Sequence, residues 1–182
     1  MHSMDRGDPA PVATGLCLST PTCSRKGEPP FVVTIQHQPK ALRPIWALVY
    51  DFTDWCSGIE VRDFKFHRRI GPSLGMAAFA NLDEDPDPLD DTSLHYLTSE
   101  QPLNIAYTFC VHMKESGFRS DVDKLKDGQR YDITLRKQRW WWMFEDDMPK
   151  DCTTDQERRE ILSKQTCCVW KPQCVAEFDM VE

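Results

Sequence analysis

Several short segments of this chain alternate apolar and polar residues, which is the pattern of a β-strand with one buried face. The alternation is clearest from Leu103 to Val111 and from Tyr131 to Leu135, and it is also present from Phe31 to Gln38. Ile45 to Phe52 is apolar on both faces and suits a central strand. No crossover helices separate these segments, so the pattern predicts an all-β fold of antiparallel strands, arranged as a sandwich or barrel.

The strand-like segments lie within residues 30–148, which we assign to one sandwich domain. Residues 1–29 are rich in Pro, Gly, Ser and Thr without periodicity, and they predict a disordered arm. Residues 149–182 are expected to form a C-terminal extension. In this extension Thr154-Asp155-Gln156-Glu157 fits a capping box, which predicts a short helix over about residues 155–165.

Charge and hydropathy exclude several classes of protein. The formal net charge of −7 gives the chain no electrostatic reason to bind nucleic acid or an anionic membrane surface. No segment approaches the ~20 apolar residues of a membrane helix, so we expect no membrane insertion. The weakly apolar stretch Val12–Leu18 is too short for a signal peptide. We therefore expect a cytoplasmic protein with free thiols, or a secreted one if the true N-terminus carries a leader.

The segment Leu125-Lys126-Asp127-Gly128-Gln129-Arg130-Tyr131 looks like the Leu-x-x-Gly-x-x-Tyr turn of immunoglobulin-like and fibronectin-like sandwiches. In those domains the glycine turns the chain into the sixth strand, and the tyrosine packs inward and hydrogen-bonds to the backbone. Asp127 stands where the family usually has proline, and the Cys…Trp…Cys core of antibody domains is absent.

The wider order of motifs resembles small fungal proteins that place such a sandwich after a disordered arm and end it with a tryptophan-rich strand. Here the order runs from Pro30-Phe31 through Trp46 and Gly128-x-x-Tyr131 to Arg139-Trp140, and it covers about residues 30–144. The resemblance implies an antiparallel immunoglobulin-like sandwich, and it carries over no functional residue.

The run Trp140-Trp141-Trp142 is the candidate binding site. Side chains of a strand alternate between its two faces, so Trp140 and Trp142 share one face and Trp141 takes the other. At least one face should be core, and the opposite face either packs under the C-terminal extension or forms a patch. Exposed tryptophans stack on sugar rings or anchor a protein partner.

Other candidate groups do not complete a known site. Asp83, Asp85 and Asp87 have the spacing of calcium ligands, but Pro88 and Leu94 occupy the positions where an EF-hand needs Gly and Glu. The C-terminal cysteines lack a Cys-x-x-Cys pair, and the five histidines are scattered over the chain. We therefore expect no metal site, no cofactor and no catalytic residue.

These observations favour a non-catalytic interaction or accessory module that binds another protein through an edge strand or through the tryptophan face. Two alternatives stay open. A carbohydrate-binding module would use Trp140, Trp141 and Trp142 as an exposed strip and would require secretion. A small enzyme would need a pocket with clustered histidine and carboxylate groups that the sequence does not reveal.

Overall fold

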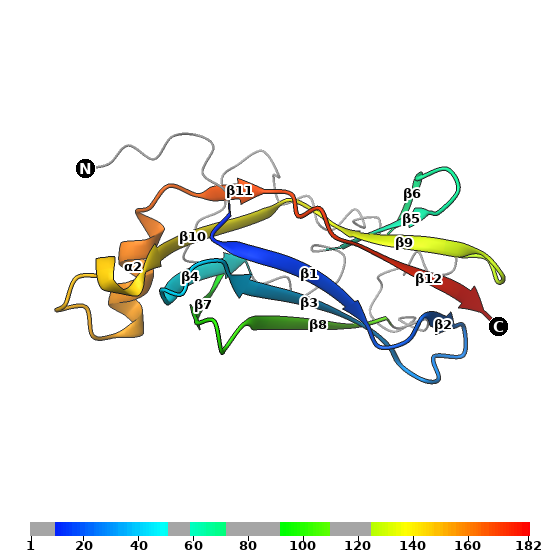
Figure 1. Cartoon of the computed structure of the whole chain (residues 1–182), viewed down its shortest axis with the longest axis horizontal. Coiled ribbons are helices and arrows are strands. Elements are labelled where there is room, and N and C mark those ends of the chain that lie inside the picture. The colour runs from blue at the N-terminus through cyan, green and yellow to red at the C-terminus, as the bar shows by residue number, and fades with distance from the viewer. Residues whose placement is uncertain (1–9, 51–58, 72–91, 110–124) are drawn as a thin grey trace.

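The computed structural model describes residues 10–50, 59–71, 92–109 and 125–182. Its regular structure is almost entirely β (Figure 1). Within these residues three sheets are formed, and all of their strand pairs are antiparallel except the pair between β2 and β12. The predicted all-β, antiparallel sandwich is therefore confirmed.

The strands fall into three sheets, which we name A, B and C. Sheet A has the order β1 (Val12–Leu18), β3 (Phe31–Pro39), β8 (Leu103–Phe109). Sheet B has the order β2 (Thr22–Ser24), β12 (Val175–Val181), β9 (Arg130–Leu135), β5 (Ile59–Asp63), β6 (Arg69–Gly71). Sheet C has the order β11 (Cys168–Trp170), β10 (Gln138–Phe144), β4 (Ile45–Tyr50), β7 (Thr92–Leu97).

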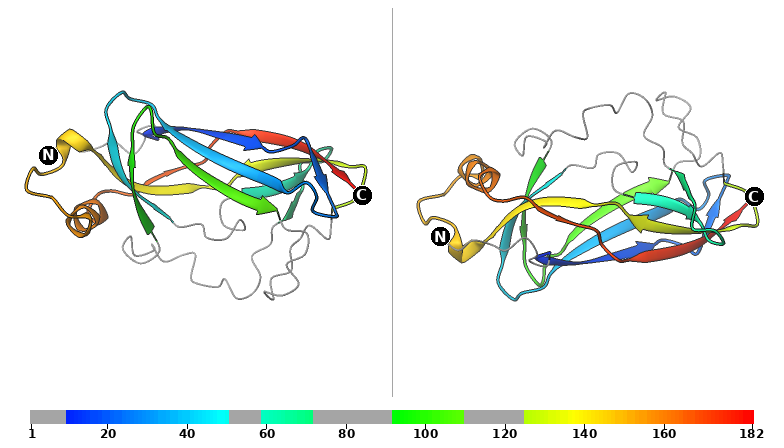
Figure 2. Two further views of the ribbon diagram at one scale, coloured as in Figure 1. Left: turned by 90° about the horizontal axis from the view of Figure 1, so that it is seen from below. Right: turned by 90° about the horizontal axis from the view of Figure 1, so that it is seen from above.

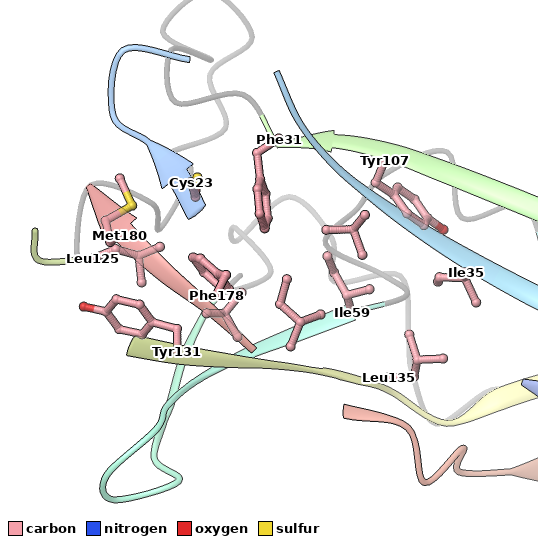
Figure 3. Packing of buried hydrophobic residues seen from close by; sticks show 13 residues of the cluster. Cys23, Phe31, Ile35, Ile59, Tyr107, Leu125, Tyr131, Leu135, Phe178 and Met180 are labelled. Atoms are coloured by element: carbon pink, nitrogen blue, oxygen red, sulfur yellow. The ribbon is translucent and has the colours of Figure 1, made fainter. Parts of the chain in front are cut away.

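Sheets A and B enclose the main core between them (Figure 3). The alternation read from the sequence places Phe31, Val33 and Ile35 of β3 inward, where they pack in one cluster with Ile133 and Leu135 of β9. All five side chains are at most 2% exposed. Removing apolar surface from water at ~25 cal/mol per Å² is the main force that holds the two sheets together.

Sheet C joins the two layers at one end of the molecule (Figure 2). Only two residues separate β9 from β10, so the chain passes from sheet B directly into sheet C. β10 then pairs with β4, which follows β3 of sheet A. The outer face of sheet C is covered by helix α2 (Asp155–Ser163), and the 3-10 turn η3 (Glu145–Asp147) follows β10.

The predicted capping box of α2 is confirmed. The Glu157 N–H donates to Thr154 Oγ1 (3.3 Å), and the Thr154 N–H donates to Glu157 Oε2 (2.9 Å). These two bonds satisfy helix amides that otherwise lack a partner, so the helix begins at Asp155.

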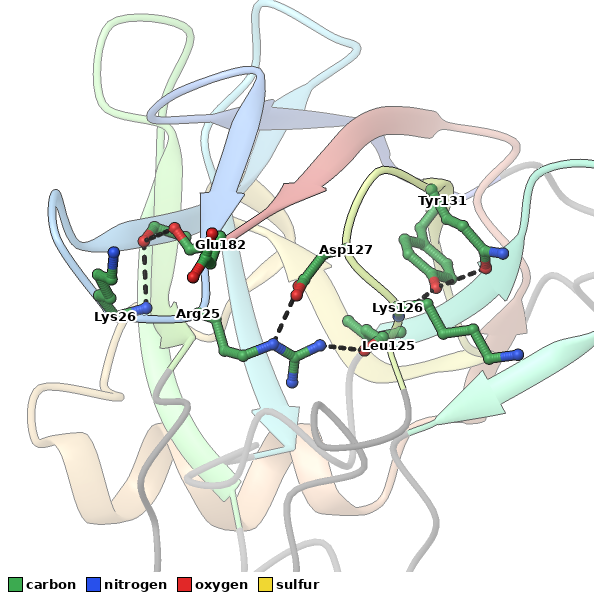
Figure 4. A network of polar contacts seen from close by, with 9 residues as sticks. Arg25, Lys26, Leu125, Lys126, Asp127, Tyr131 and Glu182 are labelled. Carbon is green, nitrogen blue, oxygen red and sulfur yellow. Dashed lines mark hydrogen bonds and ion pairs between the residues drawn. The ribbon is translucent and has the colours of Figure 1, made fainter.

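The predicted corner before β9 is also confirmed (Figure 4). Gly128 has a φ of +74°, a conformation that favours glycine. Tyr131 is 1% exposed, and its hydroxyl oxygen accepts a hydrogen bond from the Lys126 N–H at 2.7 Å. Arg25 reaches the same turn from beyond β2 and donates to Asp127 Oδ1 at 2.9 Å.

Both ends of the domain differ from the prediction. β1 pairs along its whole length with β3, and β2 pairs with β12, so residues 10–29 are not a disordered arm. Residues 1–9 lie outside the described residues. β11 and β12 belong to sheets C and B, so residues 149–182 are not an appended extension, and the sandwich is not limited to residues 30–148.

The polarity of β1 explains why sequence reasoning missed it. Val12, Leu16 and Leu18 point inward, but the outward residues Ala13 and Cys17 are small and uncharged. The contrast between buried and exposed positions, on which pattern reading depends, is therefore absent from β1.

Candidate interaction surface

Trp140 and Trp141 of the tryptophan run lie in the interior of the protein, and Trp142 is half-buried. As predicted, Trp140 and Trp142 pack in one cluster and Trp141 in another, on the opposite face of β10. Trp140 is 0% exposed and Trp141 is 5% exposed, while Trp142 is half-buried beside Phe144. Leu162 of α2 packs against the Trp141 side. With Trp140 and Trp141 in the core, the three residues do not form an exposed strip.

One histidine–carboxylate pair lies on the outer face of sheet B. His67 Nδ1 lies 3.2 Å from Oδ2 of the buried Asp132. A carboxylate at this nitrogen orients the histidine in many hydrolases. Within the part of the chain that the structure describes, however, no hydroxyl or thiol hydrogen-bonds to His67. Among the described residues, the pair therefore has no nucleophile bonded to it.

The cysteines and acidic residues do not assemble a metal site in the described parts of the chain, where no group of three or more His, Cys, Asp or Glu side chains is placed to hold an ion. Cys152 and Cys167 pack at the edge of the cluster under α2. Burial raises the pKa of the Cys23 thiol to about 11, so this thiol is unreactive near neutral pH. The acidic residues Asp83, Asp85 and Asp87 lie outside the described residues.

β1 is an edge strand of sheet A, and one set of its main-chain groups points away from β3. Residues of an antiparallel pair alternate between hydrogen-bonded and non-hydrogen-bonded positions. The Ser19 N–H donates to the Val32 carbonyl at 2.9 Å, and the Lys40 N–H donates to the Pro11 carbonyl at 2.9 Å. Hydrogen-bonded positions recur at every second residue, so between residues 11 and 19 the odd-numbered positions of β1 are the ones that bond to β3.

The even-numbered positions of β1 consequently point their N–H and C=O groups away from β3. These residues are Val12, Thr14, Leu16 and Leu18. Among the described residues no strand pairs with β1 on this side, but the Leu18 carbonyl accepts from Cys17 Sγ at 3.8 Å and Val12 is only 2% exposed. We call this set the β1 edge. Figure 1 shows β1 between β3 and β12, so β12 runs beside the strand on the side away from β3.

The outer face of sheet A carries no charge. It consists of ten side-chain positions: Ala13, Gly15, Cys17, Val32, Thr34, Gln36, Gln38, Asn104, Ala106 and Thr108. Charged residues make up 28% of the whole chain, so this face is unusual for the molecule. The outer face of sheet B, by contrast, carries Arg62, Arg130, Asp132, Glu177 and Asp179.

Natural edge strands are usually protected from pairing by charged side chains, by proline or by a bulge. β1 carries no charge, proline or bulge over its seven residues, but β12 lies beside it and Val12 at its start is buried. Sequence reasoning named an edge strand as a means of binding but did not find β1. A signal was present in the uncharged stretch Val12–Leu18, which also has apolar residues at positions 12, 16 and 18.

Comparisons with models of known protein families, with curated proteins and with solved structures found no match to this chain. Among the described residues, the helices lack the length and apolar content needed to cross a membrane. The functional interpretation therefore rests on the geometry of the chain itself.

Proposed function

We propose that this protein is a non-catalytic interaction module of the immunoglobulin-like class that binds an extended, uncharged segment of a protein partner. The segment adds as a further strand to the β1 edge of sheet A. We also propose that the chain is related to the small fungal sandwich proteins that its sequence resembles.

The strand order supports the immunoglobulin-like class. In such domains strands A, B and E lie in one sheet, and strands G, F, C and C′ follow one another in the other. The order β1-β3-β8 corresponds to A-B-E, and the order β12-β9-β5-β6 corresponds to G-F-C-C′. Tyr131 then lies at the start of strand F, which is the position of the corner tyrosine. Sheet C and its covering helix are a departure from this pattern.

The observation that carries the interaction is the β1 edge. Strand addition draws its affinity from main-chain hydrogen bonds, and alternate side chains supply the specificity. The outward N–H and C=O groups of Thr14, Leu16 and Leu18 provide the first requirement, whereas Val12 is buried. The half-buried side chains of Thr14, Leu16 and Leu18 extend the apolar interior to the margin of the sheet, where an incoming strand would cover them.

A charge at Gly15 tests the proposal. No heavy atom lies within 4 Å of a Cβ added at this position, so a longer side chain fits without disturbing sheet A. Gly15→Lys places an ammonium group on the outward face at the middle of β1, which is how natural edges are blocked. Gly15→Ala controls for the loss of glycine. Thr108→Lys controls for charge because it lies on the same face at the opposite edge of the sheet.

The measurement is quantitative mass spectrometry of proteins captured from the native cell by the full chain and by each variant. We expect a protein that the wild type, Gly15→Ala and Thr108→Lys capture equally and that Gly15→Lys loses. Equal capture by all four proteins would contradict the assignment of binding to the β1 edge.

A further inference from the structure

The hairpin between β5 and β6 ends in a tip, residues 64–69, in which every residue is exposed. We propose that this tip docks on an anionic membrane surface, with Phe64 and Phe66 at the level of the upper acyl chains and cationic side chains at the headgroups. The tip lies at the β6 margin of sheet B, so the inference goes beyond the proposed function and does not depend on the β1 edge.

Two large apolar side chains project from the tip. Phe64 is 40% exposed and Phe66 is 72% exposed. In Figure 1 the loop that carries them stands clear of β9 at one margin of the molecule. Burial of an aromatic side chain contributes strongly to folding or binding, and the fold leaves most of this contribution unused at Phe66.

The tip has the opposite charge to the chain as a whole. It carries Lys65, Arg68 and Arg69 and no carboxylate, a formal charge of +3, whereas the whole chain carries −7. Arg69 lies 3.6 Å from Glu60, but within the described ranges Lys65 and Arg68 form no ion pair. The expectation that this chain does not bind an anionic membrane came from its net charge, and a tip that presents its own cations departs from it.

Hydrogen bonds fix the shape of the tip before it meets a ligand. The Phe66 N–H donates to Asp63 Oδ1 at 2.9 Å, and the His67 N–H donates to the Asp63 carbonyl at 2.7 Å. His67 has a φ of +51°, which is uncommon for a residue other than glycine, and its Nδ1 lies 3.2 Å from Oδ2 of the buried Asp132. The turn therefore presents Phe66 outward with little further ordering needed on binding.

The cations beside the two rings have different roles. Lys65 Nζ lies 5.2 Å from the centre of the Phe66 ring, so a free ammonium group accompanies the more exposed ring. At a membrane surface an aromatic ring lies below the headgroups while a lysine beside it extends to the phosphates. The Arg130 guanidinium carbon lies 5.7 Å from the centre of the Phe64 ring, but Arg130 pairs with Asp179 at 2.9 Å. Arg130 therefore supports the ring without adding free charge.

Two other anionic partners fit the tip less well. A single strand of nucleic acid needs a groove that follows its phosphates, and a protruding loop of this size does not form one. A stable protein interface buries about 800 Å² on each partner, which is more than a hairpin tip offers. Apolar insertion and headgroup contacts, by contrast, can act at a single point. The −7 charge of the whole chain opposes closer approach, so binding should be reversible and weakened by salt.

The first experiment measures co-flotation of the full chain with vesicles at low ionic strength. We expect binding to mixed phosphatidylserine and phosphatidylcholine vesicles, and little binding to phosphatidylcholine alone. Phe66→Ser should weaken binding about tenfold or more, because it removes most of the inserted apolar surface. Lys65→Gln should weaken it roughly fivefold, because it removes one headgroup contact.

Leu42→Ser is the matched control. Leu42 is 89% exposed in the loop between β3 and β4, beside Arg43, which pairs with Asp146 at 2.8 Å. This variant should bind like the wild type. A wild type that does not bind phosphatidylserine vesicles, or an equal loss in Leu42→Ser and Phe66→Ser, would overturn the inference.

The second experiment locates the tip in the bilayer. Phe66→Trp adds a fluorophore, and its emission is obtained by subtracting the wild-type spectrum. Lipids brominated in their acyl chains should quench this added emission in the bound protein, and they should leave the added emission of Leu42→Trp unchanged. An unquenched tryptophan at position 66 would contradict insertion of the tip.

The inference and the proposed function can fail separately. Gly15→Lys should bind vesicles no more weakly than the wild type, because the β1 edge takes no part in this contact. If the wild type binds no vesicles but Phe66→Ser loses a protein that the wild type captures from the cell, the tip binds a protein and the membrane inference is wrong.

Discussion

At the scale of single residues, the hydroxyl of Tyr131 fixes the corner that leads into β9. It accepts from the Lys126 N–H at 2.7 Å and donates to Gln129 Oε1 at 3.1 Å. Tyr131→Phe leaves a partly buried amide without its acceptor, so we expect the free energy of unfolding in urea to fall by about 1–3 kcal/mol. Tyr96→Phe is the control, because the Tyr96 hydroxyl bonds Glu145 on the surface. Equal stability of Tyr131→Phe and wild type would contradict the corner's role.

His37 makes stability depend on pH. It is 0% exposed, its Nδ1 lies 3.0 Å from Thr14 Oγ1, and its ring packs edge-on against Trp140. Burial, together with the nearby His95, lowers the pKa of His37 from 6.5 to about 4. Between these values the unfolded chain binds a proton that the folded chain does not, so stability is lost as pH falls through this window.

The size of this effect follows from the shift in pKa. At pH 5 the wild type should have lost about 2 kcal/mol more of its pH 7 unfolding free energy than His37→Gln, which has no imidazole to titrate. Urea unfolding of both proteins at the two pH values measures the difference. If both proteins lost the same unfolding free energy between pH 7 and pH 5, His37 would not govern the loss of stability in acid.

At the scale of elements, β12 is required by the core, although the sequence analysis assigned its residues to a C-terminal extension. Phe178 is 1% exposed, and its ring centroid lies 5.0 Å from that of Phe31 and 5.6 Å from that of Tyr131. Phe178→Ala should lower the free energy of unfolding, measured in urea, by about 3–5 kcal/mol. Val175→Ala, on the same strand at 58% exposure, should change stability by less than about 0.5 kcal/mol. Comparable effects at the two positions would mean that β12 does not close the core.

Helix α2 acts as the cover of Trp141. Leu162 is 0% exposed and shares a cluster with Trp141, whereas Glu160 on the same helix is exposed. Leu162→Ala should lower the free energy of unfolding by about 2–5 kcal/mol. It should also increase acrylamide quenching of the Trp141 fluorescence, which is the part of the emission that Trp141→Phe removes. Glu160→Ala should leave both quantities unchanged. If quenching in Leu162→Ala matched the wild type, α2 would not be the cover.

The elements that could be predicted were those with a contrast between their faces. β3, β8 and β9 alternate clearly, and β4 was recognised as buried on both sides: Ala47 lies in one cluster and Leu48 in another. The capping box and the corner turn were also predicted, because they depend on local hydrogen bonds. β1 and β2 were missed because their burial comes from tertiary pairing rather than from their own pattern.

At the scale of the whole molecule, the position of the candidate surface could not be predicted from the sequence. Which main-chain groups of β1 point outward depends on its register with β3, and the charge-free face depends on bringing together three strands that are far apart in the chain. The tryptophan run was the conspicuous local feature, and the fold uses Trp140 and Trp141 as core.

Amide hydrogen exchange tests the use of the β1 edge most directly. Exchange would be compared between the dilute free protein and the protein bound to the partner captured from the cell. We predict that the amides of Thr14, Leu16 and Leu18 exchange fast in the free protein and slowly in the complex. The amides at the odd-numbered positions of β1, which already bond to β3, should change little. Unchanged exchange at Thr14, Leu16 and Leu18, with protection on another sheet, would contradict the proposed mode of binding.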